Sequence, residues 1–517
     1  LCSILLTSLL FYHFVRFIAI SENCSRQLIS VLNRKFPTEP TCYNLRHFGI
    51  AHFISSPIDS RLCKISDKSW LRIVVDMSQQ PDKSRHFNGV YIEASPFTFA
   101  QSLSAAAKKD PVRFASLSLR FPPDTLENFV NAVLDHALIS SSVPLNLTCS
   151  VLRQFCENPS NEQAISIARI IEHRAEEQWP DDILECLLNI ARSHPDSDRD
   201  CVPGYSIQEK GKISCHDLLQ GAVNCARGYA VVAIEALLWE HPQWAEKFCD
   251  TVESMTEDPN PAVRYAAVSC AAVWYNIDKL FSKRLFLKLL EKDIRVLGAP
   301  QAWPLVARFW DDESNYFFEK LMLSAQSHIE DLQNSAADML TVLVLMKSLP
   351  TDLLLNMPFT PTQTETVCRQ AVDNFDDDRC HELCVQILQN ILMRHDGKLH
   401  AIEALFYDNK IHIHRDKVFL ESIIEVSDCH FTSRLIKYIK ESEADISDYA
   451  EILVSIGKSL SSLSYWDIEA YVACIMRLFH SGRNNQEIKR ACLDIWDTIF
   501  FTNPIAMRPL ADLLDNV

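Results

Sequence analysis

The chain has 517 residues, of which 48% are hydrophobic and 23% charged, and its formal net charge is −17. This composition is ordinary for a globular protein, whereas the negative charge argues against nucleic acid as a partner, because phosphates attract cationic surfaces. Only 10 glycines occur, which argues against glycine-rich phosphate loops and tight β-hairpins. The composition therefore predicts helices joined by short turns.

The 18 cysteines are spread through apolar helical patterns rather than clustered. A secreted disulfide framework is short and dense in cysteine. We therefore expect reduced cysteines in the core of a cytoplasmic protein. Because the sequence begins with Leu1, we also expect it to be part of a longer protein.

Residues 1–95 are predicted to form an N-terminal helical segment that is less regular than the rest. Residues 1–20 are apolar and long enough to span a membrane. Tyr12, His13 and Arg16 interrupt this run, and no basic flank or cleavage site accompanies it. We expect a buried helix there, with a membrane segment as the alternative. Residues 71–75 fit either a short strand or a helical turn.

Residues 96–193 show clear helical repeats, beginning with Ser95 as a cap and Pro96 at the first helical position. Residues 194–214 contain acidic residues and glycines but few apolar side chains, which predicts an exposed loop or a boundary. Helical repeats resume over residues 215–517.

The most informative stretch runs from Asp258 to Asn276. Asn260 is a good N-cap and Pro261 follows it at the tolerated first position. The next apolar residues fall on one helical face and are mostly small: Val263, Ala266, Ala267, Cys270, Ala271 and Trp274. Such a face lets neighbouring helices approach closely, so we predict that this helix is buried between others.

The order of an Asp-Pro turn, Val-Arg and then alanines resembles a HEAT-type repeat. In that family the Asp and Arg form a polar ladder between stacked repeats, a role that falls by resemblance to Asp258 and Arg264. Asp110 and Arg113 repeat the pattern. Further arginines of this kind are Arg227, Arg379 and Arg490, at intervals near multiples of about 37 residues. The pattern predicts an all-α fold, an α-solenoid of HEAT-like helical hairpins that bury their faces by stacking.

No motif for catalysis or phosphate binding has its expected spacing, so the sequence predicts a non-enzymatic chain without cofactor or metal. Cys380 and Cys384 lie four apart among leucines, which favours core packing over the four converging ligands of structural zinc. His412 and His414, beside Asp416, could bind metal if the segment were extended. This gives a metal-dependent hydrolase as an alternative, although solvent-facing histidines in a turn fit the pattern better.

Four longer strings carry a second resemblance: Tyr91-Ile-Glu-Ala-Ser-Pro, Asp110-Pro-Val-Arg-Phe-Ala-Ser-Leu, Leu119-Arg-Phe-Pro, and Asn224-Cys-Ala-Arg-Gly-Tyr-Ala-Val-Val-Ala-Ile-Glu-Ala-Leu-Leu. Over roughly residues 90–420 they resemble the C-terminal helical-repeat regions of large bacterial ATP-binding proteins of the STAND type, some of which act in antiphage defence. The resemblance implies a sensor arm that recognises a foreign protein. The ATPase module of such proteins precedes the repeats, so no catalytic residue carries over to this chain.

We therefore expect a protein-recognition scaffold whose partner is a protein bound in the groove of a solenoid. The net charge predicts some basic surface on that partner, since opposite potentials favour encounter. A stand-alone HEAT-repeat adaptor or transport scaffold is the alternative with the same fold.

Overall fold

The structure is a computed structural model, and it describes residues 64–79, 85–87, 90–92, 94–195, 211–394, 400–408, 410–424, 429–442, 444–457, 464–481 and 485–502. The expectation for residues 1–20 and most of the predicted loop at 194–214 lie outside the described residues. The chain divides into two compact units, Leu1–Ala105 with Pro122–Phe129, and Ala106–Phe121 with Val130–Val517.

The described part of the first unit is mainly helical. It contains α3 (Asp67–Gln79), most of α4 (Pro96–Lys109) and a two-stranded antiparallel hairpin of β1 (Arg85–Phe87) and β2 (Val90–Ile92). Helix α3 buries Trp70, Val74 and Met77, which are four and three residues apart and so share one helical face. Residues 71–75, which fit a strand or a helix, are therefore helical.

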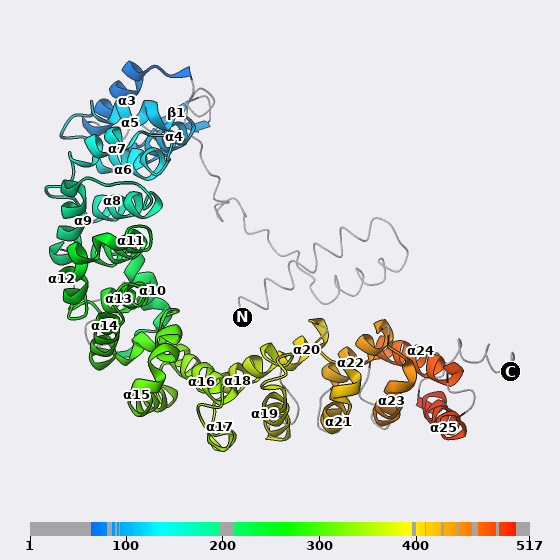
Figure 1. Cartoon of the computed structure of the whole chain (residues 1–517). Helices are drawn as coiled ribbons and strands as arrows, with labels where there is room; N and C mark the ends of the chain where they lie inside the picture. Colours follow the sequence, from blue (N-terminus) through cyan, green and yellow to red (C-terminus); the bar gives the residue numbers. More distant parts are fainter. Residues whose placement is uncertain are drawn as a thin grey trace, which may run out of the picture. The chain divides into compact units, whose positions relative to one another are not determined.

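The second unit is a succession of helices that follow one another in chain order (Figure 1). Up to Trp274 they are α5 (Pro111–Ser118), α6 (Glu127–Val133, shared with the first unit), η3 (Leu134–Leu138), α7 (Leu145–Leu152), α8 (Asn161–His173), α9 (Asp181–Ser193), α10 (Cys215–Val223), α11 (Ala226–Glu240), η5 (Pro242–Trp244), α12 (Ala245–Met255) and α13 (Pro261–Trp274). Next come α14 (Lys279–Lys292), η6 (Ile294–Gly298), α15 (Ala302–Ala325), α16 (Glu330–Leu345), α17 (Thr351–Asn356), α18 (Pro361–Asp373) and α19 (His381–Arg394). The last are η7 (His400–Glu403), α20 (Ala404–Tyr407), α21 (Ile413–Ile424), α22 (Cys429–Glu441), η8 (Ile446–Tyr449), α23 (Ala450–Gly457), α24 (Tyr465–Ser481) and α25 (Gln486–Thr502). The prediction of an all-α fold is confirmed for the described residues except for the β1–β2 hairpin, a feature that the low glycine content argued against.

Helices pack mainly against their neighbours in the chain. Helix α11 lies between α8 and α13, α18 packs against α16 and α19, and α22 packs against α24. These contacts join helices one to three places apart in the chain, so each of these helices buries apolar side chains against elements close to it in sequence.

Helix α13 forms as its sequence predicts. The Asn260 side chain accepts a hydrogen bond from the Ala262 N–H at 2.9 Å, and Pro261 occupies the first helical position. All six residues predicted to share the buried face are buried, and in fact only Arg264 and Ala272 of this helix are not. The small side chains of α13 therefore pack against several neighbouring helices and not against one alone.

The two ends of the predicted loop at 194–214 are anchored in the second unit. His194 and Ile213 are both buried, and His194 lies with its Nε2 atom 3.2 Å from the Pro159 carbonyl oxygen. The expectation of exposure therefore does not hold for these two residues.

No single helix in the described ranges is long and apolar enough to cross a membrane. Helices α10 and α11 meet that criterion only as a pair, and they are bent by 85° relative to each other.

Because Gly228 lies close to this bend, a substitution there tests how closely α10 and α11 approach each other. A Cβ atom at Gly228 would overlap the Ala222 carbonyl oxygen and lie 2.8 Å from the Cys225 sulfur. Gly228→Ala should lower the free energy of unfolding by about 1–3 kcal/mol, because overpacking outweighs the gain of up to about 1 kcal/mol in helix propensity. Urea denaturation of both variants measures this. Gly211→Ala is the control, since no described atom lies within 4 Å of a Cβ there; equal effects at the two positions would contradict the close approach of α10 and α11.

Candidate functional site

Arg227 and Asp258 form a buried ion pair between two helical pairs. Arg227 lies in the first turn of α11 and Asp258 in the turn before α13. Their side chains are 4% and 9% exposed, with Arg227 Nε 3.0 Å from Asp258 Oδ2 and Nη2 3.1 Å from Oδ1. Burial raises the pKa of Asp258 above its ordinary value near 3.8, while the Asn260 N–H and Arg227 oppose that rise. The Asn260 N–H and Arg227 thus both favour the charged form of this carboxylate.

Arg264 continues the contacts from one helical pair to the next. Its Nη1 group donates to the carbonyl oxygen of Asp258 at 2.6 Å, and its Nη2 lies 3.0 Å from Asp293 Oδ2. Arg295 also holds Asp293, with Nη2 at 2.6 Å from Oδ2. Burial alone would raise the pKa of Asp293, but the hydrogen bonds and charge of Arg295, with the charge of Arg264, hold that pKa below its ordinary value.

Asp258 and Arg264, the ladder residues predicted from the HEAT resemblance, therefore form their ion pairs with other residues and not with each other. Arg264 contacts the backbone of Asp258, whereas the carboxylate of Asp258 belongs to Arg227. The sequence analysis did not identify Asp293 and Arg295 as members of these buried contacts. A usable signal existed, since each arginine precedes its aspartate by about one helical pair: 31 residues from Arg227 to Asp258 and 29 from Arg264 to Asp293.

The other predicted ladder residues are not brought into this chain of buried contacts. The Asp110 side chain is exposed and makes no cap hydrogen bond to α5, and the Arg113 guanidinium lies 5.1 Å from the Phe114 ring. Arg379 pairs with Asp377 two residues away, and its side chain is 89% exposed. Arg490 is exposed on α25.

A further buried carboxylate, that of Asp416, contacts His381, which lies two residues after Arg379 in the chain. Asp416 is completely buried, with Oδ1 2.8 Å from Arg415 Nε and 3.1 Å from His381 Nε2. The backbone N–H of His412 donates to its other oxygen at 2.7 Å. Asp416 therefore ties the start of α21 to the start of α19.

The residues weighed as metal ligands do not converge. The Nε2 atom of His412 lies 3.8 Å from Asp376, whereas that of His414 lies 3.6 Å from Asp448, and both histidines are exposed. Cys380 and Cys384 are buried thiols, and burial raises the pKa of both. Within the described ranges, no three His, Cys, Asp or Glu side chains are placed to share a metal ion.

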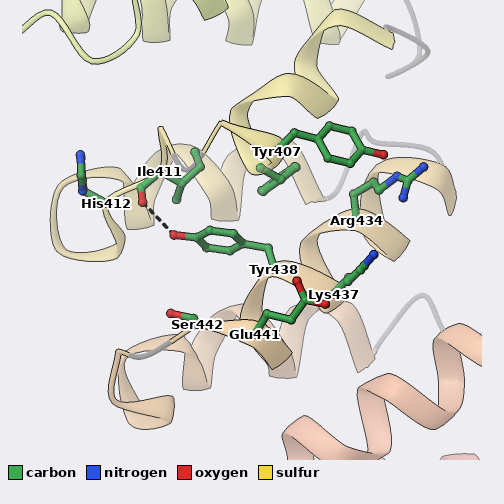
Figure 2. A pocket seen from close by; sticks show the side chains of 9 residues that line it. Tyr407, Ile411, His412, Arg434, Lys437, Tyr438, Glu441 and Ser442 are labelled. Atoms are coloured by element: carbon green, nitrogen blue, oxygen red, sulfur yellow. Dashed lines mark hydrogen bonds between the residues drawn. The ribbon is translucent and has the colours of Figure 1, made fainter.

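A concave site with a volume of about 600 Å³ lies between α20 and α22. We call it the α20–α22 pocket (Figure 2). It is lined by Phe406, Tyr407, Ile411, His412, Arg434, Lys437, Tyr438, Glu441 and Ser442. A volume in this range suits a small molecule or a few residues of a peptide.

The floor of the α20–α22 pocket is held by aromatic packing. The Phe406 ring lies 5.1 Å from Phe431 and 5.7 Å from Tyr438, between centroids. The Tyr438 hydroxyl donates to the Ile411 carbonyl oxygen at 2.8 Å, the bond drawn in Figure 2. Burial raises the pKa of the Tyr438 phenol, and Tyr449 adds to the rise. This phenol thus stays protonated at neutral pH and keeps its donor role.

The rim of the α20–α22 pocket carries an exposed aromatic ring and cations. Tyr407 is 57% exposed, and the Arg434 guanidinium lies 4.9 Å from the centre of its ring. Arg434 Nε donates to Glu403 Oε2 at 3.3 Å. Figure 2 shows Tyr407 and Arg434 side by side at one end, with Lys437 next along α22. These groups can bind anions and rings; sequence reasoning missed them because no local motif joins Tyr407 to α22.

A second hollow of about 600 Å³ lies between α14 and α15, and its lining includes Leu280, Leu287 and Tyr316. Its cations are largely neutralised within the fold. Lys283 lies 2.8 Å from Glu313, and Lys288 lies 2.5 Å from Glu253. This hollow therefore offers less unsatisfied charge than the α20–α22 pocket.

Comparisons with known proteins give no relative for this arrangement: no protein family, curated protein or solved structure matches the chain.

The buried contacts predict a stability effect at Arg264. Arg264→Ala should lower the free energy of unfolding by about 1–3 kcal/mol, because the Asp258 carbonyl and the Asp293 carboxylate lose a buried donor. Chemical denaturation provides the measurement. Arg379→Ala is the matched control, since its exposed, local ion pair should leave the unfolding midpoint unchanged. An Arg264→Ala protein as stable as the control would show that these contacts do not stabilise the fold.

Proposed function

We propose that the helices of the second unit form an α-solenoid of HEAT-like hairpins and that this solenoid is a non-enzymatic scaffold for recognising a protein. Support for the architecture comes from the packing of helices against others one to three places away in the chain, and from the buried Arg–Asp contacts of Arg227 with Asp258 and of Arg264 with Asp293. Both features are what stacked helical hairpins require.

The observation that carries the function is the α20–α22 pocket. Its rim presents an exposed tyrosine and a positioned arginine over a packed aromatic floor. Tyrosine and arginine are the residues that most often dominate binding energy at protein interfaces, because they bury large areas and still form hydrogen bonds. A peptide segment or a surface loop of a folded protein fits such a pocket.

The resemblance to STAND-type proteins suggests one setting for this scaffold, as the sensor arm of a larger ATP-binding protein. A stand-alone adaptor or transport scaffold uses the same surface. Affinity capture on the chain from phage-infected and uninfected bacterial lysates distinguishes them. A phage structural or packaging protein supports the sensor arm, whereas only host trafficking or scaffold proteins support the adaptor.

Partner binding should depend on the rim of the α20–α22 pocket. Tyr407→Ala should weaken binding of the captured partner at least about tenfold, because a central aromatic contact is worth about 2 kcal/mol. Isothermal titration calorimetry gives the affinities. Trp239→Ala is the control, since Trp239 is similarly exposed, at 54%, and lies on α11 away from the pocket lining. If Trp239→Ala reduced affinity and Tyr407→Ala did not, the binding surface would lie elsewhere.

The solenoid itself predicts an extended particle in solution. A compact globule of 517 residues would have a radius of gyration of about 24 Å. Small-angle X-ray scattering should give a clearly larger value with a predominantly helical circular dichroism spectrum. A radius near 24 Å would rule out the solenoid.

A further inference from the structure

We propose that the α20–α22 pocket binds an acidic side chain of a peptide segment, with an adjacent aromatic or large apolar side chain on Tyr407 and Phe406. This inference rests on the proposed protein-recognition function and specifies the chemistry of the partner. It is carried by the charges at the rim and by the geometry that orients them.

Arg434 is held in place before any ligand arrives. Its Nε group meets Glu403 and its guanidinium lies over the Tyr407 ring. A guanidinium has five N–H donors, and in the described part of the chain the remaining donors of Arg434 meet no acceptor. A cation that is already oriented loses little side-chain freedom on binding a carboxylate.

Lys437 supplies a second cation three residues along α22, on the same side of the helix. No carboxylate among the described residues lies within 4.0 Å of its ammonium group. Glu441 is the one carboxylate in the lining, and His412, at the far end, lies near Asp376. The lining therefore carries two cations and one anion; Glu403, outside the lining, pairs with the Nε group of Arg434, whereas Lys437 is exposed and has no such partner among the described residues.

The ligand class follows from these groups. A carboxylate can accept charge-assisted hydrogen bonds from Arg434 and Lys437 together. A ring on the neighbouring residue can pack against Tyr407, which is more than half exposed. Glu441 limits the site to about one acidic group, because a second carboxylate would face a like charge. An acidic–aromatic pair of residues satisfies all three conditions.

A matched pair of blocked dipeptides tests the proposal on the full chain. The probes are N-acetyl-aspartyl-phenylalanine amide and its neutral isostere, N-acetyl-asparaginyl-phenylalanine amide. Saturation-transfer NMR titration should show the aspartyl probe binding at least about fivefold more tightly, because a charged acceptor makes the stronger hydrogen bonds. Equal affinities for the two probes would overturn the proposal.

Two charge reversals on α22 separate the local site from the net charge. Lys437→Glu should weaken the aspartyl probe about tenfold or more and leave the asparaginyl probe little changed. Lys440→Glu changes the net charge equally, is exposed on the same helix and lies outside the pocket lining, so it should leave both probes unaffected. Equal losses in the two variants would overturn the proposal.

The outcomes also separate this inference from the proposed function. Capture of a protein partner with no binding of the aspartyl probe defeats the acidic-ligand proposal alone. Tight binding of the aspartyl probe, lost in Lys437→Glu, with no protein partner captured, supports the pocket chemistry and defeats the scaffold function.

Discussion

The packing of consecutive helices depends on buried carboxylates that arginines on other helices reach. Asp258 is paired by Arg227, Asp293 by Arg264 and Arg295, and each of these side chains is nearly or wholly enclosed. An ionised carboxylate removed from water is costly unless a cation and hydrogen bonds compensate it. The apolar faces of α11 and α13 are rich in alanine and valine and would tolerate small shifts. The ion pairs do not, so they define how one pair sits on the next.

A buried carboxylate also positions the candidate site. Asp416 is enclosed by His381, Arg415 and the His412 N–H, and so fixes the segment that enters α21. That segment carries Ile411, whose carbonyl oxygen accepts the Tyr438 hydrogen bond. The contacts of the buried Asp416 carboxylate therefore support the floor of the α20–α22 pocket indirectly, through the segment that carries Ile411. Exposed recognition groups at the rim can be varied without disturbing this support.

Much of the local structure could be predicted from single residues. Asn260 and Pro261 mark the start of α13 because the N-cap and first-position preferences are local. The burial of α13 followed from its small side chains. Residues 71–75 could not be assigned because five apolar-rich residues fit either period; the spacing of Trp70, Val74 and Met77 decides for helix. A repeat signature alone does not identify a ladder residue: Arg379 matches the signature but forms its ion pair with Asp377, two residues away.

The site was beyond the reach of sequence patterns for a related reason. Tyr407 and Arg434 are 27 positions apart and meet only because α20 packs against α22. The sequence also did not show that Asp293 is the partner of Arg264, because the residue types indicate a ladder but not which aspartate pairs with which arginine. His412 and His414 read as a possible ligand pair in sequence, whereas each faces a different carboxylate in the fold.

A double-mutant cycle on Arg227 and Asp258 tests the central claim most directly. Arg227→Ala and Asp258→Ala should each lower the free energy of unfolding by about 3–5 kcal/mol, since each leaves a buried charge without its partner. The double variant should be more stable than the sum of the two losses by about 1–3 kcal/mol, which is the coupling expected of contacting residues. Losses that simply add, within about 0.5 kcal/mol, would contradict the claim that this ion pair joins the two helical pairs.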